Sequence, residues 1–279
     1  YLWSNGDTTQ NISTLSAGSY SVTVTDLNGC ETSESVLITE PDLLTSSVDT
    51  SNYNGFGVHC NGDNDGYINL SVNDGVPTYS YLWSNGDTIQ DISALSAGTY
   101  SVTVTDLNQC TTSETVVITE PTSFVDVGGG ATTLTYAGGF NISCNGLSDG
   151  EITVQALGGV GPYTYSNGAN QNSPSSSGFF NNLSQGTYNL SVVDVNLCYI
   201  AWNNILLTEP TLLTSDISAS SNYNGEGVSC NGDNDGWIDL TVNGAVPTYS
   251  YLWSNGDTTQ NISNLSEGTY SVTVTDLNQ

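Results

Sequence analysis

Oxygen-bearing side chains alternate along two loops of this 279-residue chain, and a glycine follows each set. The residues are Asn61, Asp63 and Asp65 before Gly66, and Asn231, Asp233 and Asp235 before Gly236. Oxygen ligands at every second position, followed by a turn glycine, form the first half of a calcium loop. The pattern therefore makes both loops candidate sites for Ca²⁺ as a cofactor.

Neither loop has the whole ligand set of an EF-hand. That motif needs a bidentate acidic residue at its twelfth position, where this chain has Val72 and Val242. An ion would therefore need further ligands from another loop or from the neighbouring domain. The alternative interpretation is an Asx-rich turn that leads into a strand without any metal. In the related loop 144–150 Leu147 replaces an aspartate, so a calcium site there would be weaker or absent.

Nucleophilic catalysis finds little support in the sequence. A Ser-His-Asp or Cys-His arrangement needs a histidine, and the chain has only His59. The matching positions in the other copies of its motif are Ser143 and Ser229. Carboxylate pairs exist, but they lie in turns that recur along the chain rather than in one cleft. We therefore expect that the protein is not an enzyme.

These loops belong to a tandem repeat. The phrase TEP ends at Pro41, Pro121 and Pro210, and stretches 1–29 and 251–279 are almost identical. Units of about 80 to 90 residues fit small domains. The predicted divisions are the C-terminal part of one repeat (1–41), a complete repeat (42–121), a complete divergent repeat (122–210) and the N-terminal part of another (211–279). The chain thus resembles a window on a longer array.

The elements that must position the loops are short strands. Residues 99–106 read TYSVTVTD, in which apolar and polar side chains alternate as in a half-buried strand. Leu95-Ser-Ala-Gly-Thr-Tyr100 has the form of a tyrosine corner, and Trp83 stands where a sandwich buries its central aromatic. We interpret these aromatics as core rather than as sugar-stacking platforms. The predicted fold class is all-β, with tandem immunoglobulin-like antiparallel β-sandwich domains in an extended array.

Cysteine usage indicates disulfides. The complete repeats contain Cys60 with Cys110 and Cys144 with Cys198, and Cys30 and Cys230 lie in the two partial repeats. Pairing within repeats, which we favour, leaves Cys30 and Cys230 to pair outside this chain, with a cysteine expected at position 280. A second scheme pairs Cys30–Cys60, Cys110–Cys144 and Cys198–Cys230, and a third links distant ends of stacked domains. Spacing alone does not determine the connectivity. Any of these schemes predicts an oxidising compartment outside the cytoplasm.

The charge balance excludes two classes of partner. The chain has no lysine or arginine and 28 acidic residues. Phosphate recognition depends on Lys and Arg, so we expect no binding to nucleic acid or to anionic membrane surfaces. We also expect no direct membrane insertion of this segment, because it contains no apolar stretch long enough to span a bilayer.

The motifs CNG-x-x-DG, WSNG, L-x-x-G-x-Y-x-V-x-V-x-D and TEP occur together and in order. In this combination the chain resembles the SprB repeat, the tandem module of giant surface adhesins in gliding bacteria of the Bacteroidetes type. The resemblance implies an extracellular, cell-surface adhesin exported by the type IX secretion system. It also suggests O-linked glycosylation in the Asp-Thr phrases, at Thr8, Thr88 and Thr258. The divergent repeat 122–210 lacks the Leu-Trp pair and therefore matches the module less well.

The expected function is that of a structural and adhesive repeat in a long surface adhesin or filament, used in attachment or gliding. Expected partners are neighbouring repeats, other copies in a filament, and a glycan or surface ligand. One alternative is a carbohydrate-binding module of a secreted enzyme, for which Phe179, Phe180 and Trp202 are the clearest platform candidates. The other alternative is a self-assembling extracellular fibre subunit.

Overall fold

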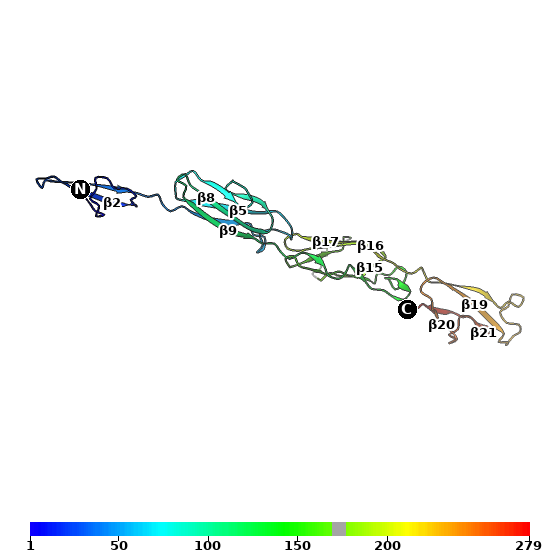
Figure 1. The fold of residues 1–279 in the computed structure, drawn as a ribbon. Coiled ribbons are helices and arrows are strands. Elements are labelled where there is room, and N and C mark those ends of the chain that lie inside the picture. Colours follow the sequence, from blue (N-terminus) through cyan, green and yellow to red (C-terminus); the bar gives the residue numbers. More distant parts are fainter. Residues whose placement is uncertain (169–176) are drawn as a thin grey trace. The chain divides into compact units, whose positions relative to one another are not determined.

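The computed structural model describes residues 1–168 and 177–279, and its ribbon is drawn in Figure 1. The chain divides into two compact units, one formed by residues 1–58 and 62–120 and the other by residues 59–61 and 121–279. Strands make up nearly all of the regular structure. Ala137–Gly139 forms a 3₁₀ turn, and the described residues contain no α-helix.

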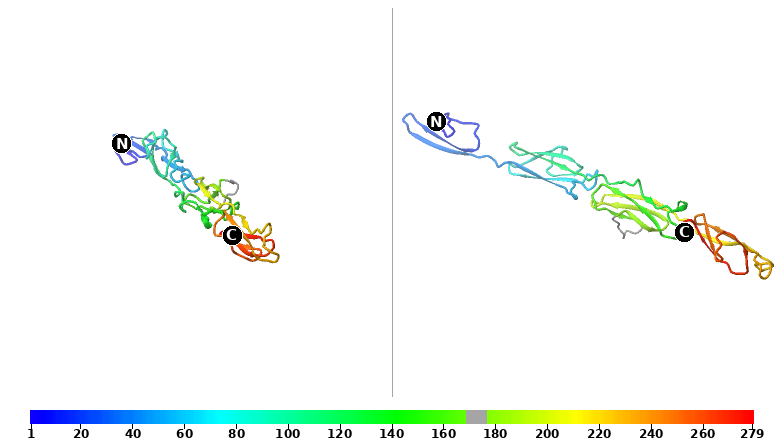
Figure 2. Two further views of the ribbon diagram at one scale, coloured as in Figure 1. Left: turned by 90° about the vertical axis from the view of Figure 1, so that its right-hand side faces the viewer. Right: turned by 90° about the horizontal axis from the view of Figure 1, so that it is seen from below.

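The first unit contains nine strands, which fall in the first two predicted segments. They are β1 (Leu2–Trp3), β2 (Gly18–Thr25), β3 (Glu31–Ile38), β4 (Thr45–Thr50), β5 (Gly66–Asn73), β6 (Ser80–Trp83), β7 (Ile92–Leu95), β8 (Gly98–Thr105) and β9 (Thr111–Ile118). Strands β1, β2 and β3 form one antiparallel sheet. The strands from Thr45 to Ile118 gather into one layered body, coloured from light blue to green in Figure 2.

The second unit contains the remaining strands. They are β10 (Val125–Asp126), β11 (Thr132–Thr133), β12 (Gly150–Thr153), β13 (Ala156–Leu157), β14 (Thr164–Ser166), β15 (Phe179–Leu183), β16 (Gly186–Val193), β17 (Tyr199–Leu207), β18 (Thr214–Ser220), β19 (Gly236–Asn243), β20 (Ser250–Trp253), β21 (Ile262–Leu265) and β22 (Val272–Thr275). Their sheets have the orders β10-β13, β11-β12-β15, β14-β16-β17, β18-β19-β21 and β20-β22. All strand pairs that form these sheets are antiparallel.

Residues 42–121 form an immunoglobulin-like sandwich. One sheet has the order β4-β5-β7 and the other β6-β8-β9, so the chain changes sheet at β6, at β7 and again at β8. Both sheets contribute side chains to one core, including Ile68 and Ile92 from the first and Val102 and Ile118 from the second. This connection matches the division of an immunoglobulin domain into an A-B-E sheet and a C-F-G sheet. The predicted all-β, immunoglobulin-like sandwich is thus confirmed.

The predicted core aromatics lie inside the sandwich. Trp83, on β6, is only 2% exposed, and its Nε1–H donates to the carbonyl of Ile89 at 2.9 Å. The Tyr100 hydroxyl donates to the carbonyl of Ser96 at 3.0 Å, which is the bond that defines a tyrosine corner. The corresponding tyrosines of the other repeats make the same bond; they are Tyr20, Tyr188 and Tyr270. The interpretation of Trp83 and Tyr100 as structural residues is therefore confirmed.

The divergent repeat fills its core from other strands. Its strand β14 carries no tryptophan, and the buried aromatics are Tyr165, Phe180 on β15 and Trp202 on β17. Phe179 points the other way and is 42% exposed. Part of the insertion that precedes these phenylalanines, residues 173–176, lies outside the described residues. Phe180 and Trp202, which the sequence offered as platform candidates, are thus core residues.

The predicted domain boundaries stay a prediction. The described residues form three separate hydrophobic cores, which lie within residues 58–118, 142–207 and 240–265. The division into compact units falls at residues 120 and 121, next to the end of one TEP phrase. Each core therefore lies inside one of the segments that the repeat pattern defines.

Candidate functional site at the repeat joints

A buried aspartate organises the loop that carries the second cysteine of each repeat. In the divergent repeat, Asp194 accepts hydrogen bonds from the backbone N–H groups of Val160 (2.8 Å), Asn196 (2.9 Å) and Cys198 (2.9 Å). Three donors satisfy a carboxylate that has no basic partner in a chain without lysine or arginine. The aspartate therefore fixes the positions of Asn196 and Cys198.

The same loop recurs in the repeats on either side. Asp106 accepts from the N–H groups of Val76 (3.0 Å) and Cys110 (2.9 Å). Burial alone would raise the pKa of Asp106, but hydrogen bonds from these backbone groups and from that of Asn108 outweigh it and hold the pKa below its ordinary value. Asp276 accepts in the same way from the N–H groups of Val246, Asn278 and Gln279.

Protonating Asp106 should weaken the fold. Because its folded-state pKa is lowered, the carboxylate stabilises the folded state above its ordinary pKa, and this stability is lost as the pH falls through the folded-state value. We expect Asp106→Asn to be less stable than the parent at neutral pH, with a difference that shrinks in strong acid. Urea midpoints measured from pH 7 down to about pH 2 test this. The exposed Asp49→Asn on β4 is the control, and an equal pH profile for the two variants would contradict the assignment.

The TEP phrase holds the loop that carries the first cysteine. Asn145 follows Cys144, and its side-chain amide donates to the carbonyl of Pro210 at 3.1 Å and to Glu209 at 2.8 Å. The N–H of Gly146 donates to the same carboxylate at 2.8 Å. In the preceding repeat Asn61 donates to Pro121 (3.1 Å), and Gly62 to Glu120 (2.7 Å). Sequence reasoning missed this bond set, although its signal was that CNG and TEP occur together in each repeat.

The disulfide in the structure joins Cys60 to Cys198. Residues 59–61 belong to the second compact unit, and Asn196 reinforces the link by donating from its side chain to the carbonyl of His59 at 2.9 Å. Cys30, Cys110, Cys144 and Cys230 are free thiols. The favoured pairing within repeats is therefore wrong for Cys60 and Cys198, as is the scheme that pairs cysteines across each TEP joint. The bond joins the first cysteine of the predicted repeat 42–121 to the second cysteine of the predicted repeat 122–210, so of the three schemes it agrees with the third.

The length of β9 explains why pairing within a repeat fails. Cys110 immediately precedes this strand, whereas the loop of Cys60 is bonded beyond its other end, where Asn61 contacts Pro121. An eight-residue strand spans roughly 27 Å. Two cysteines can form a disulfide only when their Cα atoms lie within about 7 Å. The two cysteines of one repeat therefore lie at opposite ends of the sandwich.

The loops predicted to bind calcium use several of their oxygens within the protein. Asp235 accepts from the N–H of Ser229 at 3.0 Å, and Asp233 accepts from the Ser229 hydroxyl at 2.9 Å. Hydrogen bonds from Ser229 lower the pKa of Asp235. Asn231 is exposed, Asp63 and Asp65 are half-buried, and Asn61 donates to Pro121. Within residues 1–168 and 177–279, no group of three or more His, Cys, Asp or Glu residues could hold a metal.

Calcium binding stays a prediction that melting experiments can decide. If these loops bind calcium in the folded state, millimolar Ca²⁺ raises the melting temperature of the chain and excess EDTA reverses the rise, because a ligand of the folded state stabilises it. Asp63→Asn together with Asp233→Asn should remove the effect. Asp49→Asn is the matched surface control. An unchanged melting temperature in both solutions would end the metal hypothesis.

The three threonines predicted to carry sugars all face solvent. Thr8, Thr88 and Thr258 follow an Asx turn, in which Asn85, for example, bonds both the backbone N–H and the carboxylate of Asp87. An exposed turn is accessible to a modifying enzyme, but glycosylation stays a prediction. Intact mass spectrometry of material from the source cells should show a mass above that of the polypeptide, and Thr8→Ala, Thr88→Ala and Thr258→Ala should lower it stepwise. A native mass equal to the bare chain would contradict the prediction.

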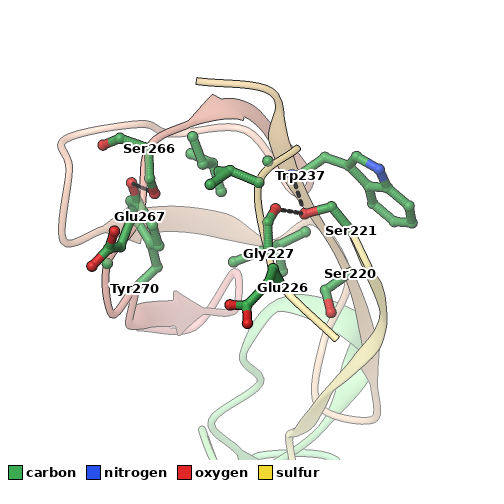
Figure 3. A pocket seen from close by; sticks show the side chains of 13 residues that line it. Ser220, Ser221, Glu226, Gly227, Trp237, Ser266, Glu267 and Tyr270 are labelled. Atoms are coloured by element: carbon green, nitrogen blue, oxygen red, sulfur yellow. Dashed lines mark hydrogen bonds between the residues drawn. The ribbon is translucent and has the colours of Figure 1, made fainter. Parts of the chain in front are cut away.

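A pocket of about 330 Å³ opens in residues 211–279, between Gly227, Trp237 and Tyr270 (Figure 3). In residues 42–121 the same place is occupied by Ile118 of β9: a Cβ atom on Gly57, the counterpart of Gly227, would lie 2.8 Å from its Cγ2. A Cβ on Gly227 would meet nothing within 4 Å. The described strands of 211–279 include no equivalent of β9. The pocket thus lies at the place that Ile118 fills in residues 42–121.

Several solved structures resemble this chain distantly. A 282-residue C-terminal fragment of intimin, in complex with the intimin-binding domain of the translocated intimin receptor, is 16% identical with a TM-score of 0.39, over 68% of this chain and 72% of that one. A tetra-tandem repeat from the extending region of a large adhesion protein is 14% identical with a TM-score of 0.26, over 96% and 73%. At TM-scores this low the likenesses carry no argument. No curated protein matches the chain.

The family comparison is more specific. The SprB repeat model matches the chain at residues 58–88, 141–170 and 226–258. Each match begins beside a Cys-Asn-Gly loop; the first continues through β5 and β6, and the third through β19 and β20. Among the described residues, no helix is long and apolar enough to cross a membrane. Three stretches of the chain therefore match the SprB repeat, the family that its motifs resemble.

Proposed function

We propose that this chain is a structural and adhesive segment of a long extracellular protein displayed on the cell surface. The observation that carries the proposal is that one loop recurs at residues 106–110, 194–198 and 276–279. Asp106, Asp194 and Asp276 organise these loops with the same kind of backbone bonds. Proteins built from stacked repeats derive their function from length and from contacts between neighbouring units. SprB repeats at three places support a role as an adhesin segment.

The disulfide supports the extracellular part of the proposal. Cys60–Cys198 would persist in an oxidising compartment and would be reduced in the cytosol. Export by the type IX secretion system, and use in attachment or in gliding, are the finer parts of the proposal. In this role the repeats carry out no catalysis, and they present their binding surfaces to a glycan or another surface ligand.

The carbohydrate-binding alternative is weaker than the sequence suggested. Sugar-binding platforms need exposed aromatic faces, but Phe180 and Trp202 are buried in the core of the divergent repeat. Phe179 is the one of the three predicted platform residues that remains exposed. A single exposed ring gives a far smaller stacking surface than the coplanar set that this alternative requires.

Immunogold electron microscopy of intact source cells tests the proposal. Antibody raised against residues 1–279 should label the cell surface and any filaments that extend from it. Cells that lack the gene, and antibody absorbed beforehand with the purified chain, are the controls. Label confined to soluble secreted material would overturn the proposal and favour the carbohydrate-binding module. The deletion strain also tests the finer role. If cells without the gene attach and glide as before, the protein is needed for neither attachment nor gliding.

A further inference from the structure

We propose that every joint of the array is closed by the same disulfide, between the first cysteine of one repeat and the second cysteine of the next. Cys60–Cys198 is one such link. Cys144 would form the next, with a cysteine at position 280 as its partner. This inference concerns the covalent assembly of the repeats and does not depend on what they bind.

The second joint reproduces the hydrogen bond that accompanies the disulfide of the first. Asn196 donates from its side chain to the carbonyl of His59, the residue before Cys60, at 2.9 Å. Asn278 donates in the same way to the carbonyl of Ser143, the residue before Cys144, also at 2.9 Å. The loop at the end of the chain therefore lies against Cys144 as the loop of Cys198 lies against Cys60.

Both halves of the second joint are also held as in the first. The loop of Cys144 is fixed through Asn145 to Pro210 at 3.1 Å, and the loop of Cys60 through Asn61 to Pro121 at the same distance. On the other side Asp276 accepts from the backbone of Val246, as Asp194 does from Val160. Equivalent hydrogen bonds thus position the two loops in both joints, independently of the disulfide.

The spacing within the loop assigns the missing partner. In each of the three earlier copies a cysteine stands two residues after the loop asparagine: Asn28 and Cys30, Asn108 and Cys110, Asn196 and Cys198. Two residues after Asn278 is position 280. The N–H of Asn278 donates to the Asp276 carboxylate as that of Asn196 does to Asp194. The N–H of Gln279 donates to the Asp276 carbonyl at 3.4 Å, as that of Leu197 does to the Asp194 carbonyl at 3.1 Å, so the backbone that leads to position 280 follows the path of the earlier loop. A cysteine there would meet Cys144, which is a half-buried free thiol.

The covalent step is a thiol–disulfide exchange. Two thiols lose two protons and two electrons and form one S–S bond. The oxidant is a small disulfide such as oxidised glutathione, which accepts the electrons and protons and leaves as two thiols. The thiolate of one loop attacks this oxidant first, and the second thiolate then displaces the glutathione from the mixed disulfide.

Counting thiols in the 279-residue chain gives the first test. After refolding in a glutathione redox buffer at low protein concentration, we expect four free thiols in the isolated monomer, at Cys30, Cys110, Cys144 and Cys230. Peptide mapping should show the single pair Cys60–Cys198. Recovery of Cys60–Cys110 or Cys144–Cys198 would overturn the proposal, because both pairs belong to linkage within a repeat.

Adding one cysteine after Gln279 gives the second test. Peptide mapping of the extended monomer should show Cys144 joined to the added cysteine, with thiols left at Cys30, Cys110 and Cys230. Asn278→Ala should slow formation of this bond, and Cys144→Ser should leave the added cysteine free. Gln279→Cys without the extension is a second control. It places the thiol at position 279 instead of 280, and this thiol should form a disulfide with Cys144 poorly. An added cysteine that pairs with Cys230, or stays reduced while Cys60–Cys198 forms, would overturn the proposal.

Discussion

Replacing Cys198 by serine should lower the free energy of unfolding by about 3–5 kcal/mol. The disulfide closes a loop with a sequence separation of 138 residues, and a loop of this length removes much of the entropy of the unfolded chain. Cys60→Ser should have a similar effect, and the double variant should cost little more than either alone, because both changes break one bond.

Urea titration under oxidising conditions measures this effect. Cys110→Ser and Cys144→Ser are matched controls, because each removes a thiol that makes no disulfide in this chain, and both should stay close to the parent. A reducing agent should lower the stability of the parent to that of Cys198→Ser and should leave this variant unchanged. Equal losses for Cys198→Ser and Cys110→Ser would show that the disulfide contributes nothing.

Trp83→Ala should destabilise the sandwich of residues 42–121 by about 3–5 kcal/mol. The side chain is only 2% exposed, and it packs in the core between the two sheets. Its truncation leaves a cavity. It also removes the N–H group that donates to the carbonyl of Ile89, so this carbonyl oxygen loses its hydrogen bond from Trp83. Because the core of this repeat is separate from the cores in 122–279, the other repeats should keep their stability.

The neighbouring residue provides the control for this variant. Leu82 lies next to Trp83 on β6 but is 61% exposed, so Leu82→Ala should change the stability by less than about 0.5 kcal/mol. Far-ultraviolet circular dichroism against urea follows the unfolding without relying on the tryptophan that is removed. A loss for Leu82→Ala equal to that for Trp83→Ala would show that the strand itself, and not the buried ring, sets the stability.

Much of the sandwich could be predicted from the sequence because its signals are local. Alternation in residues 99–106 indicated β8, where Val102 and Val104 are buried while Ser101 and Thr103 face solvent. The tyrosine corner needed only the spacing from Ser96 to Tyr100, which the structure confirms with a hydrogen bond. A period of two and a turn of fixed length are both visible within ten residues of sequence.

The joint could not be predicted in the same way because its partners are far apart in the chain. The pair Cys60–Cys110 requires the two cysteines to be neighbours, but strand β9 separates the loops that carry them. The role of Glu209 was missed because a lone acidic residue in a TEP phrase gives no sign that it bonds Gly146. Placing the cysteines at the ends of the predicted strands would have excluded pairing within a repeat.

The Cys60–Cys198 bond also decides which part of the chain bears a pulling force. When the ends of the chain are drawn apart, tension passes through the sulfur atoms, and the residues between the two cysteines are bypassed. Fully extended, the chain between these cysteines, which are 138 positions apart, would measure roughly 450–500 Å. This segment, which includes every strand from β5 to β16, cannot be extended by the force while the bond is intact. Reduction would release it, so the redox state of one cysteine pair sets how far the protein can stretch.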